Sequence, residues 1–271
     1  MTYKFLLLFI IYLFLFSCDN ENINEVPTYI KIDSIVLDEN TSQNISDVWI
    51  YIDDILQGVY ELPIEVPLLV EGNHKLRIKA GIRENGISAT RIPFPFYTSY
   101  IIEEQNFIEE ETITLNPVFN YIDNITVIKE NFEGIGVNIE STLISDTTIN
   151  LINTPNNNYG EGILTDSLIT FEVATDEFNI DQLGPVFLEL DYKSNTQFLV
   201  GIYANFPQSL VLQKDIIWIT PKDEWNKIYI NLSSTIQESN QAESFKVFIG
   251  MKRDFTKDTN WVNLDNITII Y

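Results

Sequence analysis

Trp225-Asn226-Lys227-Ile228-Tyr229-Ile230-Asn231-Leu232 is the stretch that decides the fold class of this chain. Its aliphatic residues occupy every second position, and successive side chains of a strand point to opposite faces of a sheet. The stretch therefore predicts a β-strand with Ile228, Ile230 and Leu232 on the buried face. Similar runs recur along the chain between clusters of Asn, Asp, Gly and Pro, and no long segment has a helical period. The sequence predicts an all-β protein.

The same alternation sorts the neighbouring predicted strands into two faces. One face is mostly aliphatic and should form the core: Leu188, Leu190, Tyr192, Ile202, Ala204, Ile217, Ile219, Phe245, Val247, Ile249 and Met251. The opposite face mixes carboxylates with flat aromatic rings, and its candidate ligand-binding residues are Glu189, Asp191, Tyr203, Trp218 and Tyr229. Rings can stack on the C–H face of a sugar while carboxylates accept hydrogen bonds from its hydroxyls. The alternative is that this face packs against the first domain or another protein.

The predicted second domain spans residues 118–271. It opens with Glu130-Asn131-Phe132-Glu133-Gly134 and closes with Trp261-Val262-Asn263-Leu264-Asp265-Asn266-Ile267. Together with the 225–232 strand, these motifs resemble a carbohydrate-binding-module jelly roll of the galactose-binding-like type. The resemblance covers most of residues 130–271. It implies a β-jelly-roll sandwich, with a glycan as the leading ligand.

The resemblance also implies a structural Ca²⁺ ion. Related jelly rolls often tie the first strand to the last with one such ion, and Glu133 and Asp265 match those positions. Because Ca²⁺ takes about six to eight oxygen ligands, loop carbonyls would have to complete the shell. The alternative is that the two carboxylates accept hydrogen bonds and cap turns. We expect no catalytic cofactor.

Two observations argue against catalysis. Glu189-Leu190-Asp191 resembles the start of the Glu-x-Asp-x-x-Glu strand of laminarinase-like glycoside hydrolases, which need a second carboxyl about 5–10 Å away. The positions where that carboxyl should fall hold Lys193 and Ser194. His74 is the only histidine, and it lies in a predicted turn far in sequence from any nucleophile, which disfavours a Ser-His-Asp triad. We expect a non-catalytic binding protein.

The predicted first domain spans residues 29–117. A strand over 48–52 is followed by an Asp53-Asp54 turn, a Gly58-to-Pro63 step, a turn at Glu71-Gly72-Asn73-His74 and a strand over 75–79. This order resembles a PEGA-type domain, a small β-sandwich of the bacterial envelope, over about residues 48–115. The resemblance implies a spacer or interaction module without chemistry of its own.

The N-terminus predicts where the protein resides. Lys4, an apolar run over residues 5–16 and Ser17 are typical of a secretory signal, and Cys18 directly after them resembles a bacterial lipoprotein signal. The run has about 12 residues, whereas a membrane-spanning helix needs about 20. We therefore expect a signal peptide over 1–17, acylation of Cys18, a tether over 18–28 and anchoring to the outer membrane. The acidic residues after Cys18 resemble the surface-export signal of Bacteroidetes lipoproteins, which implies exposure at the cell surface.

Charge excludes one class of partner. The chain has 16 Lys and Arg against 39 Asp and Glu, a formal net charge of −23. Nucleic acid is bound through a cationic surface, so we exclude it as a ligand. The candidate partners are a glycan or, in the alternative, an envelope protein. In that second case the chain would be a structural or assembly subunit of a secretion, gliding or nutrient-uptake machine.

Overall fold

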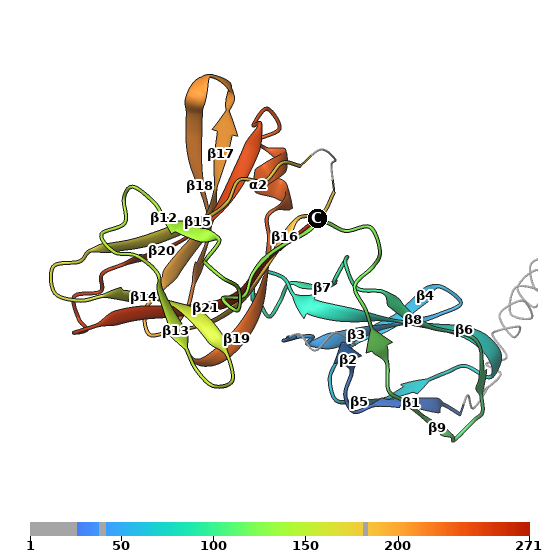
Figure 1. The fold of residues 1–271 in the computed structure, drawn as a ribbon. Coiled ribbons are helices and arrows are strands. Elements are labelled where there is room, and N and C mark those ends of the chain that lie inside the picture. The colour runs from blue at the N-terminus through green and yellow to red at the C-terminus, as the bar shows by residue number, and fades with distance from the viewer. Residues whose placement is uncertain (1–25, 38–41, 181–183) are drawn as a thin grey trace, which may run out of the picture.

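The computed structural model describes residues 26–37, 42–180 and 184–271. These residues form two groups of β-strands, which confirms the predicted all-β class (Figure 1). The helical segments within them are the short η1 (Pro207–Ser209) and α2 (Ser233–Gln237). In this described part of the chain, no helix has the length and apolar character needed to cross a membrane.

The first group of strands belongs to residues 28–119. The strands are β1 (Thr28–Ile32), β2 (Val36–Leu37), β3 (Asp47–Ile52), β4 (Ile55–Glu61), β5 (Ile64–Leu68), β6 (Gly72–Arg83), β7 (Arg91–Pro93), β8 (Ser99–Phe107), β9 (Thr112–Leu115) and β10 (Val118–Phe119). One sheet has the order β4-β3-β6-β7 with β8 also on β6, another has the order β5-β1-β9, and β2 pairs with β10. The strands predicted over 48–52 and 75–79 lie within β3 and β6.

The second group is a two-sheet β-sandwich. Its first sheet contains β11 (Val127–Glu130), β13 (Asn150–Asn153), β14 (Asn158–Leu164), β16 (Phe187–Ser194), β19 (Lys222–Asn231) and β21 (Asn260–Ile270). Its second sheet contains β12 (Ile139–Ser141), β15 (Thr170–Thr175), β17 (Phe198–Phe206), β18 (Leu210–Ile219) and β20 (Ser244–Lys252). The orders are β13-β14-β21-β16-β19, with β11 on β21, and β12-β15-β20-β17-β18. This is the predicted jelly-roll sandwich.

The core of the sandwich is built from the face that alternation selects. Leu188, Leu190, Ile202, Ile230 and Ile249 are all buried in one cluster that draws on both sheets. Position 162 in this layer requires glycine, because a Cβ there would lie 2.4 Å from the ring of Phe171. The buried side chains of the two sheets therefore interdigitate, and their opposite faces point away from each other.

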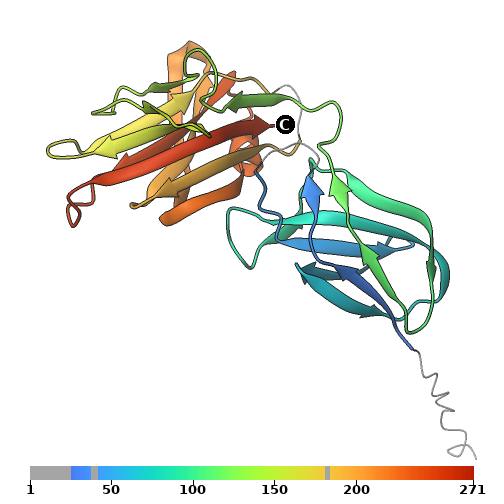
Figure 2. The same cartoon turned by 60° about the horizontal axis from the view of Figure 1, so that its bottom comes forward.

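The two domains lie next to each other (Figures 1 and 2). They share apolar packing and hydrogen bonds. Phe187, Tyr229 and Ile270 of the second domain belong to the core cluster of the first domain. The Phe94 ring lies 5.3 Å from the Phe187 ring, measured between centroids. The Asn85 backbone N–H donates to the Tyr229 carbonyl at 2.8 Å. The first domain therefore covers one end of the outer face of the β16–β19 sheet.

Candidate functional site

The five residues that we predicted to share one face lie on two sheets. Glu189 and Asp191 project from β16 and Tyr229 from β19, whereas Tyr203 and Trp218 project from β17 and β18. These strands belong to opposite sheets of the sandwich, and the outer faces of the two sheets point in opposite directions. The prediction of one five-residue ligand face is therefore wrong. Alternation separates the buried face from the outer face, but it does not say which sheet a strand joins.

Tyr229 and Glu189 lie under the first domain. The Tyr229 ring is 4.9 Å from the Phe94 ring, and its hydroxyl is 3.1 Å from the Tyr97 hydroxyl. Burial, together with the negative charge of Glu189, raises the pKa of the Tyr229 hydroxyl far above its usual range, so it stays neutral. The alternative of packing against the first domain thus holds for Tyr229. The aromatic partners of Tyr229 in the first domain are Phe94 and Tyr97. Trp49, another aromatic residue of that domain, donates its indole N–H to Asp47 at 3.0 Å.

Glu189 forms a buried ion pair with Lys227 of β19. The Lys227 Nζ to Glu189 Oε2 distance is 2.7 Å, and both side chains are less than 5% exposed, at 4% and 2%. The Tyr121 hydroxyl also lies 2.9 Å from each carboxylate oxygen. This group borders a cavity of about 350 Å³ beneath residues 121–127, which are largely aliphatic on that side. The Glu189 carboxylate therefore connects β16, β19 and the segment that contains Tyr121.

Asp191 lies at an open cavity on the outer face of the same sheet. We call this cavity the sheet groove; its volume is about 310 Å³, and it is lined by Ser42, Gln43, Asn157, Asp191, Trp225, Asn226, Lys227, Asp265 and Asn266. Asp191 and Asp265 are cross-strand partners on β16 and β21, so two carboxylates lie side by side in it. Both residues are buried, at 7% and 4% exposure.

The two carboxylates differ in how their oxygens are satisfied. Asp265 accepts hydrogen bonds from the Asn157 side chain at 2.9 Å and from the Asn266 backbone N–H at 2.7 Å. Burial raises its pKa, and the neighbouring Asp191 charge adds to the effect, against the lowering by these hydrogen bonds. Asp191 accepts through Oδ2 from Asn266 at 2.9 Å and from Ser42. Its Oδ1 is buried and has no hydrogen-bond partner among the described residues.

An aromatic pair borders the sheet groove. The Trp225 side chain is 40% exposed, and its ring meets the Tyr159 ring edge-on at 5.4 Å. The ammonium of Lys193 lies 5.2 Å from the Trp225 centroid. We did not predict Trp225 as a site residue, although it follows the same alternation as Lys227 and Tyr229. Extending that alternation two positions towards the N-terminus would have found it; Tyr159, on distant β14, has no comparable signal.

Tyr203 and Trp218 lie on the outer face of the other sheet and are not together. Trp218 is the cross-strand partner of Leu199, and Tyr203 lies four positions further along β17, which separates them by roughly 13 Å. The Tyr203 ring packs on Phe248, and its hydroxyl donates to buried Glu172 at 2.5 Å. Trp218 is 51% exposed. Of three cavities among the described residues, with volumes of about 310, 340 and 350 Å³, none is lined by both of these rings.

The predicted calcium residues are hydrogen-bonded to two consecutive asparagines. Glu133 accepts from the backbone N–H and the side-chain amide of Asn158, at 2.8 and 2.9 Å, and Asp265 accepts from Asn157. In the described ranges, no group of three or more His, Cys, Asp or Glu residues could hold a metal ion. The two carboxylates accept hydrogen bonds from these asparagines. Calcium at Glu133 and Asp265 stays a prediction, and a chelator-dependent unfolding temperature would check it.

Comparison with solved structures finds carbohydrate-binding modules with β-sandwich folds. The family 11 module from Clostridium thermocellum, in complex with a β-1,3-1,4-mixed-linked tetrasaccharide, has 15% sequence identity and a TM-score of 0.37 over 54% of this chain and 94% of that chain. A carbohydrate-binding module from a study of promiscuous specificity in the β-sandwich superfamily has 16% identity and a TM-score of 0.43. The match covers 90% of this chain and 98% of that chain.

The family 30 module of a cellulosomal cellulase from Clostridium thermocellum has 16% identity and a TM-score of 0.37, over 53% of this chain and 91% of that chain. No protein-family model matches the chain, and no curated protein sequence matches it. These likenesses concern strand arrangement. What the sheet groove binds has to follow from its own residues.

Proposed function

We propose that this protein binds a glycan at the sheet groove without cleaving it. The observation that carries the proposal is Trp225, a partly exposed indole beside the paired carboxylates of Asp191 and Asp265. An indole offers a flat apolar surface for the C–H face of a sugar ring. Asp191 and Asp265 line the groove beside this indole, and carboxylate oxygens have further lone pairs that can accept hydrogen bonds from sugar hydroxyls.

Binding to a single groove of this size should be weak. The groove offers one indole and a few hydrogen bonds, and these must offset the cost of immobilising a flexible sugar. Its carboxylates favour hydroxyl donors and disfavour ligands that bring a negative charge close to Asp191. A neutral glycan therefore fits the groove best.

The carboxylate pair supports binding rather than hydrolysis. A glycosidase needs one carboxyl free to donate a proton and another free to attack or to activate water. Both oxygens of Asp265 are already held by Asn157 and Asn266. Asp191 shares Asn266 as a partner, which ties the two carboxylates into one fixed network.

A glycan array with the Trp225→Ala variant tests this function. The wild-type protein should retain neutral glycans that the variant loses, because the stacking surface is gone. Trp218→Ala is the matched control, since Trp218 is also about half exposed but lies on the other sheet. Equal glycan binding by wild type and Trp225→Ala, or release of reducing sugar from a bound glycan, would contradict the proposal.

We also propose that the protein is an outer-membrane lipoprotein acylated at Cys18 and exposed at the cell surface. Cys18 lies outside the described residues, and the proposal rests on the sequence of residues 4–18. Cys18→Ala should release the protein from the membrane fraction and abolish incorporation of a labelled fatty acid. Unchanged pelleting of the variant together with an unlabelled wild type would contradict it.

A second candidate function is contact with an envelope protein through β18. Leu210, Val211 and Leu212 are consecutive and 40–52% exposed, and Trp218, further along the same strand, is 51% exposed. β18 is the last strand in the order of its sheet, and exposed edge strands are sites of pairing with other chains. Cross-linking from residue 211 in whole cells would test it: capture of an envelope protein supports contact, and no adduct counts against it.

A further inference from the structure

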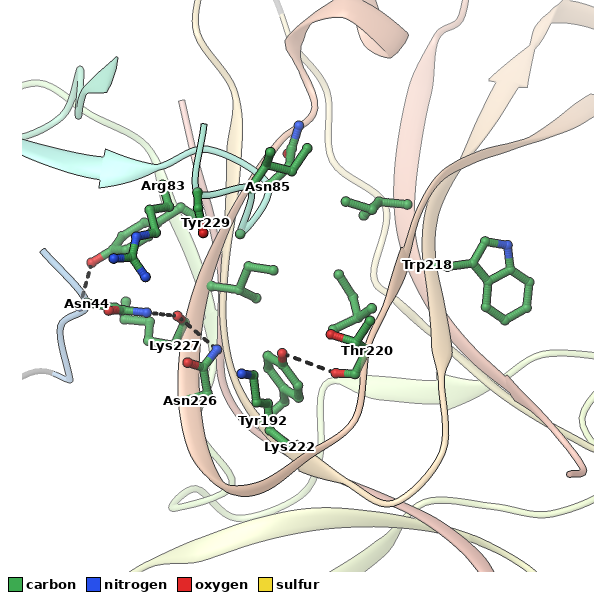
Figure 3. A pocket seen from close by; sticks show the side chains of 16 residues that line it. Asn44, Arg83, Asn85, Tyr192, Trp218, Thr220, Lys222, Asn226, Lys227 and Tyr229 are labelled. Carbon is green, nitrogen blue, oxygen red and sulfur yellow. Dashed lines mark hydrogen bonds between the residues drawn. The ribbon is translucent and has the colours of Figure 1, made fainter. Parts of the chain in front are cut away.

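A separate cavity lies where the two domains meet. We call it the junction pocket; its volume is about 340 Å³. The first domain contributes Asn44, Arg83 and residues 85–88, and the second contributes Tyr192 of β16 and residues of β18, β19 and the turn between them (Figure 3). Gly86 packs so closely on Ile228 that a Cβ there would lie 2.9 Å from its Cδ1 atom. The pocket therefore exists only while the domains are docked.

The charge of the junction pocket is opposite to that of the chain. Its lining includes Arg83, Lys222 and Lys227 but no Asp or Glu, in a chain where acidic residues outnumber basic ones by 39 to 16. Lys227 is paired with Glu189. Lys222 is exposed and forms no ion pair within the described residues. Lys222 is therefore available to an anionic ligand.

Arg83 supplies a second cation from the opposite domain. One of its terminal amino groups is bound to Glu61, whereas its Nε atom is buried without a hydrogen-bond partner in the part of the chain that the structure describes. In Figure 3 the Trp218 ring lies on the far side of β18, away from the other labelled side chains. The pocket is lined by cations, amides and hydroxyls together with the rings of Tyr192 and Tyr229 and several isoleucines.

The size and the polar groups of the pocket restrict the ligand. Its volume is near the lower end of the range of about 300–1,000 Å³ for ligand pockets, which suits a single sugar ring. Asn85 accepts from the Asn231 backbone through Oδ1, which leaves its Nδ2 atom as a donor, and Ser88 adds a hydroxyl. We infer that the junction pocket binds a carboxylate-bearing monosaccharide unit, a uronic acid, with its carboxylate between Lys222 and Arg83. This pocket is a separate cavity from the sheet groove, although Asn226 and Lys227 border both.

Titration of the full chain with D-glucuronate and with D-glucose, followed by backbone amide NMR shifts, tests the inference. Glucuronate should shift the amides of residues 85–88 and 220–226, and glucose should not. Lys222→Gln should weaken glucuronate binding about tenfold or more, since a charge-assisted hydrogen bond is lost. Lys214→Gln is the matched control, because Lys214 is on β18 but lines none of the three cavities.

Three results would overturn the inference: no glucuronate binding by the wild type, equal binding of glucose, or an unchanged affinity in Lys222→Gln. Trp225→Ala separates the two sites, because it should remove neutral-glycan binding and leave the glucuronate titration as in the wild type. A protein that fails on the glycan array but passes the Lys222 test would contradict the proposed function alone.

Discussion

Asp265 is the residue whose titration the structure describes most clearly. Its pKa is raised by burial, with a further contribution from the Asp191 charge. The folded state therefore holds a proton at pH values where the unfolded chain, with a carboxyl pKa of about 3.9, has lost it. This contribution to stability is fully present below the unfolded pKa and is lost as the pH rises through the folded pKa.

Asp265→Asn should therefore gain stability relative to the wild type as the pH rises from about 4 to about 7. The variant also changes hydrogen bonds with Asn157, but that offset does not depend on pH. Unfolding temperatures of both proteins across this range provide the measurement.

Asp254→Asn is the control of opposite sign. Hydrogen bonds from Thr256 lower the pKa of Asp254, so its contribution is present above the unfolded pKa and lost on acidification. Relative to the wild type, the unfolding temperature of Asp254→Asn should therefore fall as the pH rises from about 4 to about 7. Parallel pH profiles for wild type and Asp265→Asn would show that the Asp265 carboxyl is not perturbed.

At the scale of elements, the ion pair between Glu189 of β16 and Lys227 of β19 is buried, whereas the pair between Glu177 and Lys246 is exposed. Removing one partner of a buried pair leaves a charge without compensation, which costs about 3–5 kcal/mol. Exposed pairs contribute about 0–1 kcal/mol, because water and salt screen them.

Glu189→Met should therefore lower the free energy of unfolding by about 3–5 kcal/mol, and adding Lys227→Met should recover much of the loss. Urea denaturation of the two single variants and the double variant measures the coupling. Glu177→Met and Lys246→Met form the matched cycle, with single costs of about 1 kcal/mol or less. If the coupling energy of Glu189 and Lys227 were no larger than that of Glu177 and Lys246, the buried ion pair would not stabilise the fold as predicted.

Much of the strand pattern could be predicted from sequence, because burial in a sandwich repeats every two residues. Leu190, Ile230 and Ile249 are buried for that reason. Sheet membership could not be predicted, because β16 pairs with strands that are far away in the sequence. Trp218 and Trp225 both follow the outward alternation, yet they lie on opposite sheets, and only the structure separates them. An outward ring such as Tyr229 gives the same signal whether a sugar or a domain covers it.

At the scale of the whole molecule, Phe94 connects the two domains. Its ring lies within 5.3 Å of Phe187 and 4.9 Å of Tyr229, measured between centroids. Phe107 is equally buried in the first domain, but its ring contact is with His74 of the same domain. The two phenylalanines therefore separate the effect of the interface from that of the core.

The wild-type chain should unfold in one cooperative transition, since the domains share a core. Phe94→Ala should cost about 3–5 kcal/mol and split the transition in two. Phe107→Ala should cost a similar amount but keep one transition at a lower temperature. Calorimetry distinguishes these outcomes, and two transitions in the wild type would contradict the coupling.

The position of β1 has a mechanical consequence. A force that pulls on the N-terminal end and on a ligand in the sheet groove would act on the packed contact between the domains and on β1. That strand is paired along its length with β5 on one side and β9 on the other. A pull along β1 would shear the backbone hydrogen bonds on both sides together instead of opening them one at a time. The domain that we expected to be a passive spacer is arranged to resist tension.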